Sequence, residues 1–354
     1  MAPAETMRAA VVRAHGGYDA VRVETVPAPR AGPGEVLLRV RAAGVNHLDT
    51  WVRRGMKGVT IALPRVLGSD ATGEIVELGP GAERCGLAPG DRAFLYPATS
   101  CGHCRACLRG EEQLCPRYAI FGEDTGGVMA EYAAVPWTSV FPLPAGITFA
   151  QGAAFPLTFL TAWHMLVGRA GVRPGEWVLV HAAGSGVGAA ALQIARLHGA
   201  RVIATAGSEE KCARARALGA EHAVNYSAGG EAGDFRAAAL QVTGLAGVDV
   251  VVEHVGAATF KDSLRALAVG GRLVTCGATT GPKVELNLPA LFRKGISVLG
   301  STMGSRAELV EVARHVEAGR LQVVVDRVLP LADVSEAHRL LQERVVFGKV
   351  VLEP

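Results

Sequence analysis

The segment from residue 177 to 206 constrains the fold more than any other part of the chain. An apolar run at 177–181 leads into a glycine-rich turn, a helical stretch at about 186–198 and a second apolar run at 201–206. Apolar residues recur at i, i+4 and i+7 in the helical stretch, so one of its faces can pack on a sheet. The pattern predicts a strand–helix–strand unit with parallel strands.

The same alternation continues along the chain to about residue 278. Its strands, such as the run at 247–256, are hydrophobic on both faces and are joined by helical stretches. Strands of this kind need helices on both sides of the sheet. We therefore predict an α/β fold whose nucleotide-binding domain, at about 151–284, is a doubly wound parallel sheet of the Rossmann type.

The turn after the first of these strands carries G-x-G-x-x-A, with Gly184, Gly186 and Ala189 in the three key places. The first glycine permits a tight turn, the second lets the backbone approach a pyrophosphate, and the small third residue allows close packing. Free N–H groups at the start of the helix, around Ser185 and Val187, would bind the phosphates. A turn without a ligand is the alternative, but the flanking strand and helix favour a dinucleotide.

The end of the next strand predicts which dinucleotide binds. NAD-dependent enzymes usually place an acidic residue there for the ribose 2′-hydroxyl, whereas this chain has Gly207 and Ser208, followed by Lys211. A neutral tip with a nearby cation suits a 2′-phosphate, so NADPH is expected. The alternative is that Lys211 is an ordinary solvated residue, and the neighbouring Glu209 and Glu210 count against a phosphate unless they point into solvent.

The first 150 residues follow a different pattern. Residues 35–43 alternate apolar and charged side chains with the period of two that marks a half-buried strand. Short apolar runs at 74–79, 92–97 and 130–136 follow, separated by Gly and Pro. This part of the chain is therefore predicted to be a small β-rich domain with antiparallel or barrel-like strands.

Composition excludes several classes of partner. The net charge is only +3 and aromatic residues make up 5% of the chain, so we expect neither nucleic acid nor a membrane as partner. Charged residues interrupt the N-terminal segment, and no apolar run approaches the roughly 18 residues of a spanning helix. A cytoplasmic location is expected.

Four of the seven cysteines lie in one loop, at about 98–117, with the spacing C-x2-C-x2-C-x7-C. Four thiolates so close together fit a closed tetrahedral zinc site, which is structural because no coordination position stays open. An iron–sulfur cluster is the main rival, although the last gap in bacterial ferredoxins is about three residues. An empty lobe is the other alternative. The predicted zinc ligands are Cys101, Cys104, Cys107 and Cys115.

Together, the β-rich domain, the G-x-G-x-x-A unit and the cysteine spacing resemble the medium-chain dehydrogenase/reductase superfamily over essentially the whole chain. The resemblance implies a split, GroES-like catalytic domain at 1–150 and 285–354 around the nucleotide-binding domain. It also implies a zinc lobe like that of the family's alcohol dehydrogenases. A homodimer or homotetramer is implied too, with residues 295–304 as a candidate interface edge.

The resemblance does not extend to the catalytic zinc of those alcohol dehydrogenases. The places of its ligands and of the glutamate beside them are taken here by Asn46, Ser69, Asp70 and Leu157. Leucine cannot ligate a metal and serine is a poor ligand. The hydroxyl residue of the usual proton relay is replaced by Leu48. No catalytic zinc is expected.

Residues 45–55 resemble instead the zinc-free quinone oxidoreductase branch of the family. That branch lines its active cleft with an Asn, an Asp and an aromatic residue, and the matching positions here are Asn46, Asp49 and Trp51. It surrounds the adenosine 2′-phosphate with a Gly, a Lys and a Tyr, and the matching positions are Gly207, Lys211 and Tyr226. Thr161 matches the threonine on the nicotinamide side.

The combination predicts an NADPH-dependent oxidoreductase that reduces a quinone or an α,β-unsaturated carbonyl by hydride transfer. Conjugation spreads the developing charge in such substrates, and Asn46 would donate a hydrogen bond to the carbonyl oxygen in place of a metal. Asp49 is interpreted as an orienting residue, Trp51 as a pocket wall or a core contact, and Arg53 and Arg54 as solvated charges. The alternatives are an alcohol/aldehyde dehydrogenase of the zinc-containing type and a non-catalytic NADPH-binding protein.

Overall fold

The computed structural model describes residues 5–56 and 58–354, and its chain divides into two compact units. Unit 1 consists of the chain up to Leu157 together with Val323–Pro354, and unit 2 is Thr158–Gln322. Within the described residues, no helix is both long enough and apolar enough to cross a membrane.

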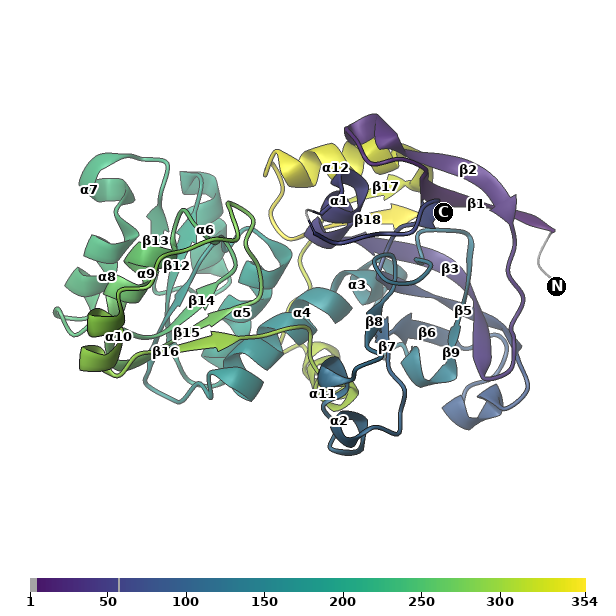
Figure 1. Ribbon diagram of the computed structural model, residues 1–354, viewed down its shortest axis with the longest axis horizontal. Coiled ribbons are helices and arrows are strands. Elements are labelled where there is room, and N and C mark those ends of the chain that lie inside the picture. Colours follow the sequence, from purple (N-terminus) through teal and green to yellow (C-terminus); the bar gives the residue numbers. More distant parts are fainter. Residues whose placement is uncertain (1–4, 57) are drawn as a thin grey trace. The chain divides into compact units, whose positions relative to one another are not determined.

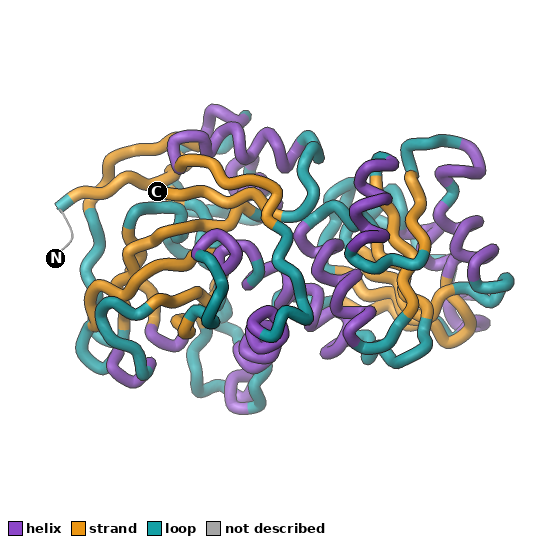
Figure 2. Tube along the Cα trace, turned by 180° about the vertical axis from the view of Figure 1, so that it is seen from behind, coloured by secondary structure: helices purple, strands orange, loops and turns teal. Residues whose placement is uncertain are grey.

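Unit 1 is built mainly from strands, drawn in orange in Figure 2. They are β1 (Thr6–Val12), β2 (Val21–Pro27), β3 (Glu35–Val45), β4 (Arg65–Val66), β5 (Asp70–Leu78), β6 (Arg92–Leu95), β7 (Ala98–Thr99), β8 (Ala119–Ile120), β9 (Tyr132–Pro136), β10 (Val140–Pro142), β17 (Val325–Pro330) and β18 (Lys349–Glu353). The main sheet has the order β10–β6–β5–β3–β18–β17, and β9 also pairs with β3. Strands β2, β1 and β4 form a smaller sheet, and β7 pairs with β8.

The last strand of the chain completes the main sheet of unit 1. Strand β18 runs antiparallel to β3, with Val350 opposite Val45 and Val351 opposite Gly44. It is fully buried except at its end, so burial on both faces fixes its register. This pairing brings the start of β18 beside the residue that follows β3.

Helices accompany these strands in unit 1. They are α1 (His47–Arg54), α2 (Arg105–Leu108), α3 (Phe149–Ala154) and α12 (Val334–Gln342). Helix α3 packs across β3, β5 and β18 of the main sheet. Helix α12 buries Leu340, Leu341 and Ala337 in the same hydrophobic core as Val36 and Leu38 of β3. That core explains the alternating pattern of β3, where Arg39 between the apolar residues is exposed.

Unit 2 contains the predicted parallel sheet (Figure 1). Its strands are β11 (Trp177–Val180), β12 (Arg201–Ala206), β13 (His222–Asn225), β14 (Val248–Glu253), β15 (Leu267–Thr275) and β16 (Ser297–Gly300). They pair in parallel in the order β13–β12–β11–β14–β15–β16. This is the Rossmann strand order, which confirms the predicted fold class; it reverses direction between β11 and β14, where open α/β sheets bind their ligands.

Helices cover both faces of this sheet. They are α4 (Pro156–Trp163), α5 (Gly186–Leu197), α6 (Glu209–Ala217), α7 (Gly230–Gly233), α8 (Phe235–Val242), α9 (Phe260–Ala266), α10 (Leu288–Lys294) and α11 (Arg306–Glu317). Leu179, Ile203 and Val251 pack with Phe260 of α9 in one core. Val178, on the opposite face, is equally buried, which explains why these strands are apolar throughout.

The division between the units differs from the one expected from the sequence. The sequence analysis assigned residues from 285 onward to the catalytic domain, whereas the structure returns to unit 1 at Val323. The physical reason is β16, which pairs with β15 through Val298 opposite Leu273 and so extends the parallel sheet of unit 2.

Arg53, interpreted from the sequence as a solvated charge, is only 1% exposed, so that interpretation was wrong. Its guanidinium lies 4.9 Å from the centre of the Tyr18 ring and donates to Gln342 Oε1 at 2.8 Å. His338 of α12 is also completely buried, and neither of its ring nitrogens has a hydrogen-bond partner among the described residues. Burial, and secondarily the charge of Arg53, lowers the pKa of His338 to about 3.

His338 makes the stability of unit 1 depend on pH. Its pKa in the folded state lies below the ordinary value of 6.5, so below that pH the unfolded chain binds a proton that the folded chain does not. Stability therefore falls as pH drops from 6.5, by about 1.4 kcal/mol per pH unit. We expect His338→Leu to melt at a higher temperature than the wild type, with a difference that widens between pH 7 and pH 5. Parallel melting curves across this range would contradict the assignment.

Candidate active site and metal centre

Asn46 lies between β3 and α1, where it caps the helix. Its backbone N–H donates to Asp49 Oδ2 at 2.7 Å, and its side chain accepts from the N–H of Asp49 to complete a capping box. The other carboxylate oxygen of Asp49 accepts the N–H of Gly68 at 3.1 Å. Both oxygens of Asp49 are thus bound to backbone, which suits a carboxylate that orients the start of the helix.

The Asp49 carboxylate is 1% exposed. Burial raises its pKa to about 7, against the opposing effects of the N–H donors of Asn46 and Gly68 and of the charge of Lys349. Asp49 is therefore a carboxylate that can change its charge near neutral pH, and it is hydrogen-bonded to the backbone of Asn46.

The side chains of Asn46, Asp70 and Lys349 form one buried cluster in unit 1, in which each is less than 5% exposed. Asn46 Nδ2 donates to Asp70 Oδ2 at 2.9 Å. Lys349 Nζ donates to Asn46 Oδ1 at 2.5 Å and to Asp70 Oδ2 at 3.2 Å. The backbone N–H of Leu157 donates to Asp70 Oδ1 at 2.9 Å. Three of the four positions that correspond to the catalytic zinc site of the alcohol dehydrogenases therefore meet here.

These residues do not fit a catalytic zinc. Leu157 contributes only a backbone N–H, the Ser69 hydroxyl donates to the carbonyl of Phe121 at 2.7 Å, and the carboxylate of Asp70 is paired with Lys349. Zinc needs several converging N, S or carboxylate ligands. In this cluster the positive charge is the ammonium group of Lys349, whereas in a catalytic zinc site it would be the metal ion.

The other two predicted catalytic residues, Trp51 and Thr161, are not part of the cluster formed by Asn46, Asp70 and Lys349. Trp51 is half-buried on α1, in unit 1. Thr161 lies on α4, in unit 2, where it is 5% exposed and its hydroxyl points to the sulfur of Met303 at 3.9 Å. Their roles stay predictions.

The glycine-rich turn follows β11 and leads into α5, as the sequence predicts. Ser185 caps the helix, with its hydroxyl oxygen accepting the N–H of Gly188 at 2.9 Å. A Cβ on Gly188 would lie 2.3 Å from the carbonyl oxygen of Ala182, so this position, which the sequence analysis did not single out, tolerates only glycine. Ala182 itself has the left-handed backbone conformation, with φ of 47°. Gly186 is the first helical residue.

A buried chain of hydrogen bonds connects this turn to the strand β14. The Ser263 hydroxyl donates to Glu253 Oε2 at 2.9 Å, so its oxygen accepts from His181 Nε2 at 2.8 Å. His181 Nδ1 then accepts from the Thr205 hydroxyl at 3.2 Å, and Thr205 accepts the N–H of Ala182 at 3.1 Å. Burial lowers the pKa of His181 to about 4, which keeps the ring neutral as this arrangement requires. This network is not predictable from the sequence, where its local signal is a histidine three positions before Gly184.

Two of the residues expected around a 2′-phosphate, Gly207 and Tyr226, lie against each other at the tip of β12. A Cβ on Gly207 would lie 2.7 Å from the hydroxyl of Tyr226. Only glycine at this position therefore leaves room for the Tyr226 side chain to pack against the backbone. Ser208 caps α6 by accepting the N–H of Lys211 at 3.2 Å. Glu209, at the start of the same helix, is exposed. Ser208 and Lys211 thus stand in the first turn of α6, and the N-terminus of a helix suits an anionic ligand.

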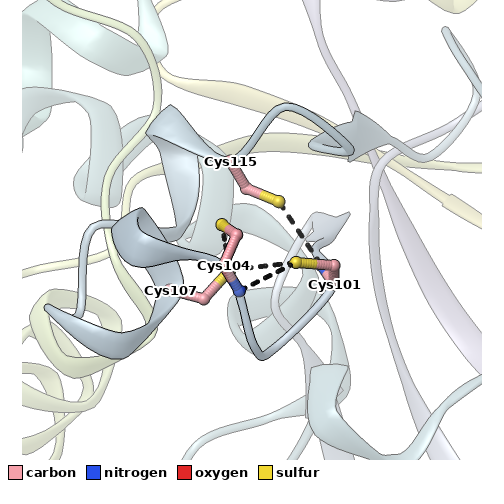
Figure 3. Close-up of side chains that lie close together, drawn as sticks. All are labelled: Cys101, Cys104, Cys107 and Cys115. Carbon is pink, nitrogen blue, oxygen red and sulfur yellow. Dashed lines mark hydrogen bonds between the residues drawn. The ribbon is translucent and has the colours of Figure 1, made fainter.

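The four clustered cysteines converge in unit 1 as predicted, with all their sulfurs within 4.8 Å of one another (Figure 3). Cys101 Sγ lies 3.9 Å from Cys107 Sγ, and Cys104 Sγ lies 3.6 Å from Cys107 Sγ. A tetrahedron with Zn–S bonds of about 2.3 Å has edges of about 3.8 Å, so the geometry fits zinc. Backbone N–H groups point at the sulfurs, as Arg117 does at Cys115 at 3.3 Å. These four are the one such group of potential metal ligands in the described part of the chain.

Two family models match the chain, each within one unit. The model described as alcohol dehydrogenase GroES-like domain matches residues 32–145, and the one described as zinc-binding dehydrogenase matches residues 186–318. The first range falls in unit 1 and the second in unit 2.

Curated relatives resemble the chain over its full length. An alcohol dehydrogenase of Geobacillus stearothermophilus is 32% identical over 98% of this chain and 99% of the relative. A quinone oxidoreductase of Rattus norvegicus is 31% identical over 98% of this chain and 97% of the relative. An acryloyl-coenzyme A reductase of Metallosphaera sedula is 31% identical over 98% of this chain and 99% of the relative.

Solved structures share the fold. A structure described as an NAD-dependent alcohol dehydrogenase is 50% identical, with a TM-score of 0.93 over 98% of this chain and all of the other. A crotonyl-CoA carboxylase/reductase in complex with NADP is 26% identical, with a TM-score of 0.89 over all of this chain and 95% of the other. These similarities confirm the resemblance inferred from the glycine turn and the cysteine spacing. The chain is an oxidoreductase of the medium-chain dehydrogenase/reductase superfamily.

Proposed function

We propose that this oxidoreductase transfers a hydride from NADPH to a quinone or an α,β-unsaturated carbonyl, without a catalytic metal. The observation that supports this most is the Asn46 amide. It is held by Lys349 and Asp70 at a position that corresponds to a zinc ligand in the alcohol dehydrogenases. Relatives named quinone oxidoreductase and acryloyl-coenzyme A reductase support the substrate class.

The chain's own contribution to the reaction is to fix and polarise the substrate carbonyl. NADPH, when bound, supplies the hydride. The Asn46 amide nitrogen carries two hydrogens, of which one is donated to Asp70; we assign the other to the carbonyl oxygen of the substrate. Hydride addition places negative charge on that oxygen, and a fixed N–H donor stabilises it. The final proton is assigned to solvent.

The reaction class is tested by measuring NADPH oxidation with a panel of quinones, enones, simple aldehydes and ketones. Turnover of the conjugated substrates, with little or none of the simple carbonyls, supports the proposal. Tight NADPH binding with no turnover on any member would indicate a non-catalytic binding protein.

Alcohol/aldehyde interconversion with a catalytic zinc is the second candidate, because the structure at 50% identity is described as an alcohol dehydrogenase. Metal analysis of the purified protein separates the two. We expect about one zinc per chain, held by the four cysteines. Two zinc ions per chain, together with alcohol oxidation, would favour the alcohol dehydrogenase.

The choice of NADPH over NADH rests on the tip of β12, since the similar structures include both an NAD-dependent enzyme and an NADP complex. We expect Lys211→Ala to weaken NADPH binding by about 10- to 100-fold, because a charge-assisted contact with the 2′-phosphate is lost. NADH binding is expected to stay unchanged. Fluorescence titration with both cofactors checks this, with exposed Lys261→Ala as the matched control. Equal loss for NADH would refute the assigned role.

We also propose that the protein is a homodimer or homotetramer. Apolar side chains of α10 and β16, among them Leu288, Phe292 and Val298, are exposed at the edge of the parallel sheet. A second copy pairing with β16 would cover them and complete the edge. Sedimentation velocity over a range of concentrations tests this, and a monomer throughout would overturn it.

A further inference from the structure

Lys349 is a buried cation beside Asn46 whose position the sequence does not predict. It is the first residue of β18, 4% exposed, and it follows Asn46 by 303 positions in the chain. The antiparallel pairing of β18 with β3 places it beside Asn46, which directly follows β3. The ammonium group contacts two side-chain oxygens, Asn46 Oδ1 and Asp70 Oδ2.

These contacts determine which way the Asn46 amide faces. An ammonium group has only hydrogens to donate, so the amide must present its oxygen to Lys349 and its nitrogen to Asp70. Rotating the amide by half a turn would set its NH₂ group against the ammonium. It would also set its oxygen against a carboxylate oxygen, which costs both hydrogen bonds in a buried site.

Asp70 is held equally firmly. One of its oxygens accepts the N–H of Leu157, and the other accepts from Asn46 and Lys349. The carboxylate is completely buried, and Lys349 is its ionic partner in the described part of the chain. The three side chains therefore form a unit in which each fixes the others.

We propose that Lys349 is a positioning residue, which orients the Asn46 amide so that its nitrogen is the donor toward the substrate. The ammonium also draws electron density from the amide oxygen, which makes the amide hydrogens better donors. This inference rests on the proposed function only in so far as Asn46 contacts the substrate. The orientation of the amide by Lys349 is a separate statement and can be tested separately.

The kinetic test compares Lys349→Met, Asn46→Ala and the double variant in NADPH oxidation with an enone. Lys349→Met is expected to lower kcat roughly 10- to 100-fold, with KM for NADPH unchanged. Because Lys349 acts through Asn46, adding Lys349→Met to Asn46→Ala should change kcat by less than about threefold. Effects that multiply, or an unchanged kcat in Lys349→Met, would overturn the inference. Lys261→Met, an exposed lysine in unit 2, is the control for general loss of a lysine.

Removing Lys349 alone leaves the Asp70 carboxylate buried without its ionic partner, and this could prevent folding. The same comparison is then made in an Asp70→Asn background, where removing Lys349 no longer leaves a charged carboxylate at position 70 without its ionic partner. Circular dichroism confirms that each variant is folded. In that background too, Asn46→Ala should have a much smaller effect on kcat when Lys349 is already methionine.

Melting temperatures of the same variants give a readout that does not depend on catalysis. If Lys349 and Asn46 are bonded as the structure shows, the double variant should lose less melting temperature than the two single shifts added together, because both single variants remove the same Lys349–Asn46 contact. A melting temperature equal to the sum of the two single shifts would overturn the inference. If the wild type reduces no conjugated substrate, the proposed function fails, and this cycle still decides whether Lys349 orients Asn46.

Discussion

Asn46→Ala is expected to lower kcat for a quinone or enone by about 10²- to 10³-fold, the usual effect of removing one hydrogen-bond donor to a developing oxyanion. The donor is worth this much because Asn46 is buried and its amide is already oriented, so no reorganisation is needed during the reaction. The affinity for NADPH is expected to be unchanged, since the residues proposed to bind its phosphates lie in unit 2. Steady-state kinetics with the enone varied, together with an NADPH titration, check both parts.

The same substitution also removes part of the cap of α1, and this needs a control. Loss of a capping side chain costs about 1 kcal/mol, and Asn287→Ala removes a comparable cap from α10, where Asn287 accepts the N–H of Ala290 at 3.1 Å. Asn287→Ala should therefore lower stability without lowering kcat. An Asn46→Ala protein that is folded and turns over at the wild-type rate would show that the carbonyl is activated elsewhere.

Cys104→Ser is expected to abolish metal binding in the loop at 98–117 and to lower the melting temperature markedly. Structural zinc contributes a binding free energy on the order of 10 kcal/mol in small zinc domains. Without it, four sulfurs less than 5 Å apart have no common partner. Elemental analysis should find about one zinc per chain in the wild type and close to none in the variant. Limited proteolysis should then cleave within this loop.

Cys85→Ser is the matched control for the metal site. Cys85 is half-buried outside the cluster, and its thiol donates to the carbonyl of Leu87 at 3.8 Å. This variant should keep its zinc and its resistance to proteolysis. Wild-type protein that contains iron, or that binds no metal after purification without chelators, would contradict the zinc assignment.

The parts predicted correctly from the sequence are those in which the signal lies within a short stretch. The helix expected at about 186–198 is Gly186–Leu197 in the structure, and the strand expected at 201–206 has those bounds. The spacing of the four cysteines predicted that they lie in one cluster, because four thiolates so close in the sequence are typical of a closed zinc site. The expectation that no catalytic zinc binds likewise rests on single residues, since leucine at position 157 cannot ligate a metal, and it stays a prediction.

Other features depended on which strands pair. Lys349 begins a short apolar strand near the C-terminus, and nothing in its neighbours predicts that it meets Asn46. Only the pairing of β18 with β3 brings the two together. The place where the chain returns to unit 1, at Val323 instead of 285, was decided by β16 adding to the edge of β15. A buried strand is apolar whichever sheet it joins, so its sequence does not predict which strand it pairs with.

By itself, then, the sequence determined the parallel sheet of unit 2, the glycine turn before α5 and the clustering of the four cysteines, because periodicity and spacing are local properties. The tertiary structure decided what surrounds Asn46: a carboxylate from β5 and an ammonium from β18, each contributed by a distant part of the chain. The physical reason is that a buried charge requires a partner. Which residue becomes that partner is set by the register of paired strands, and this register exists only once the sheet has formed.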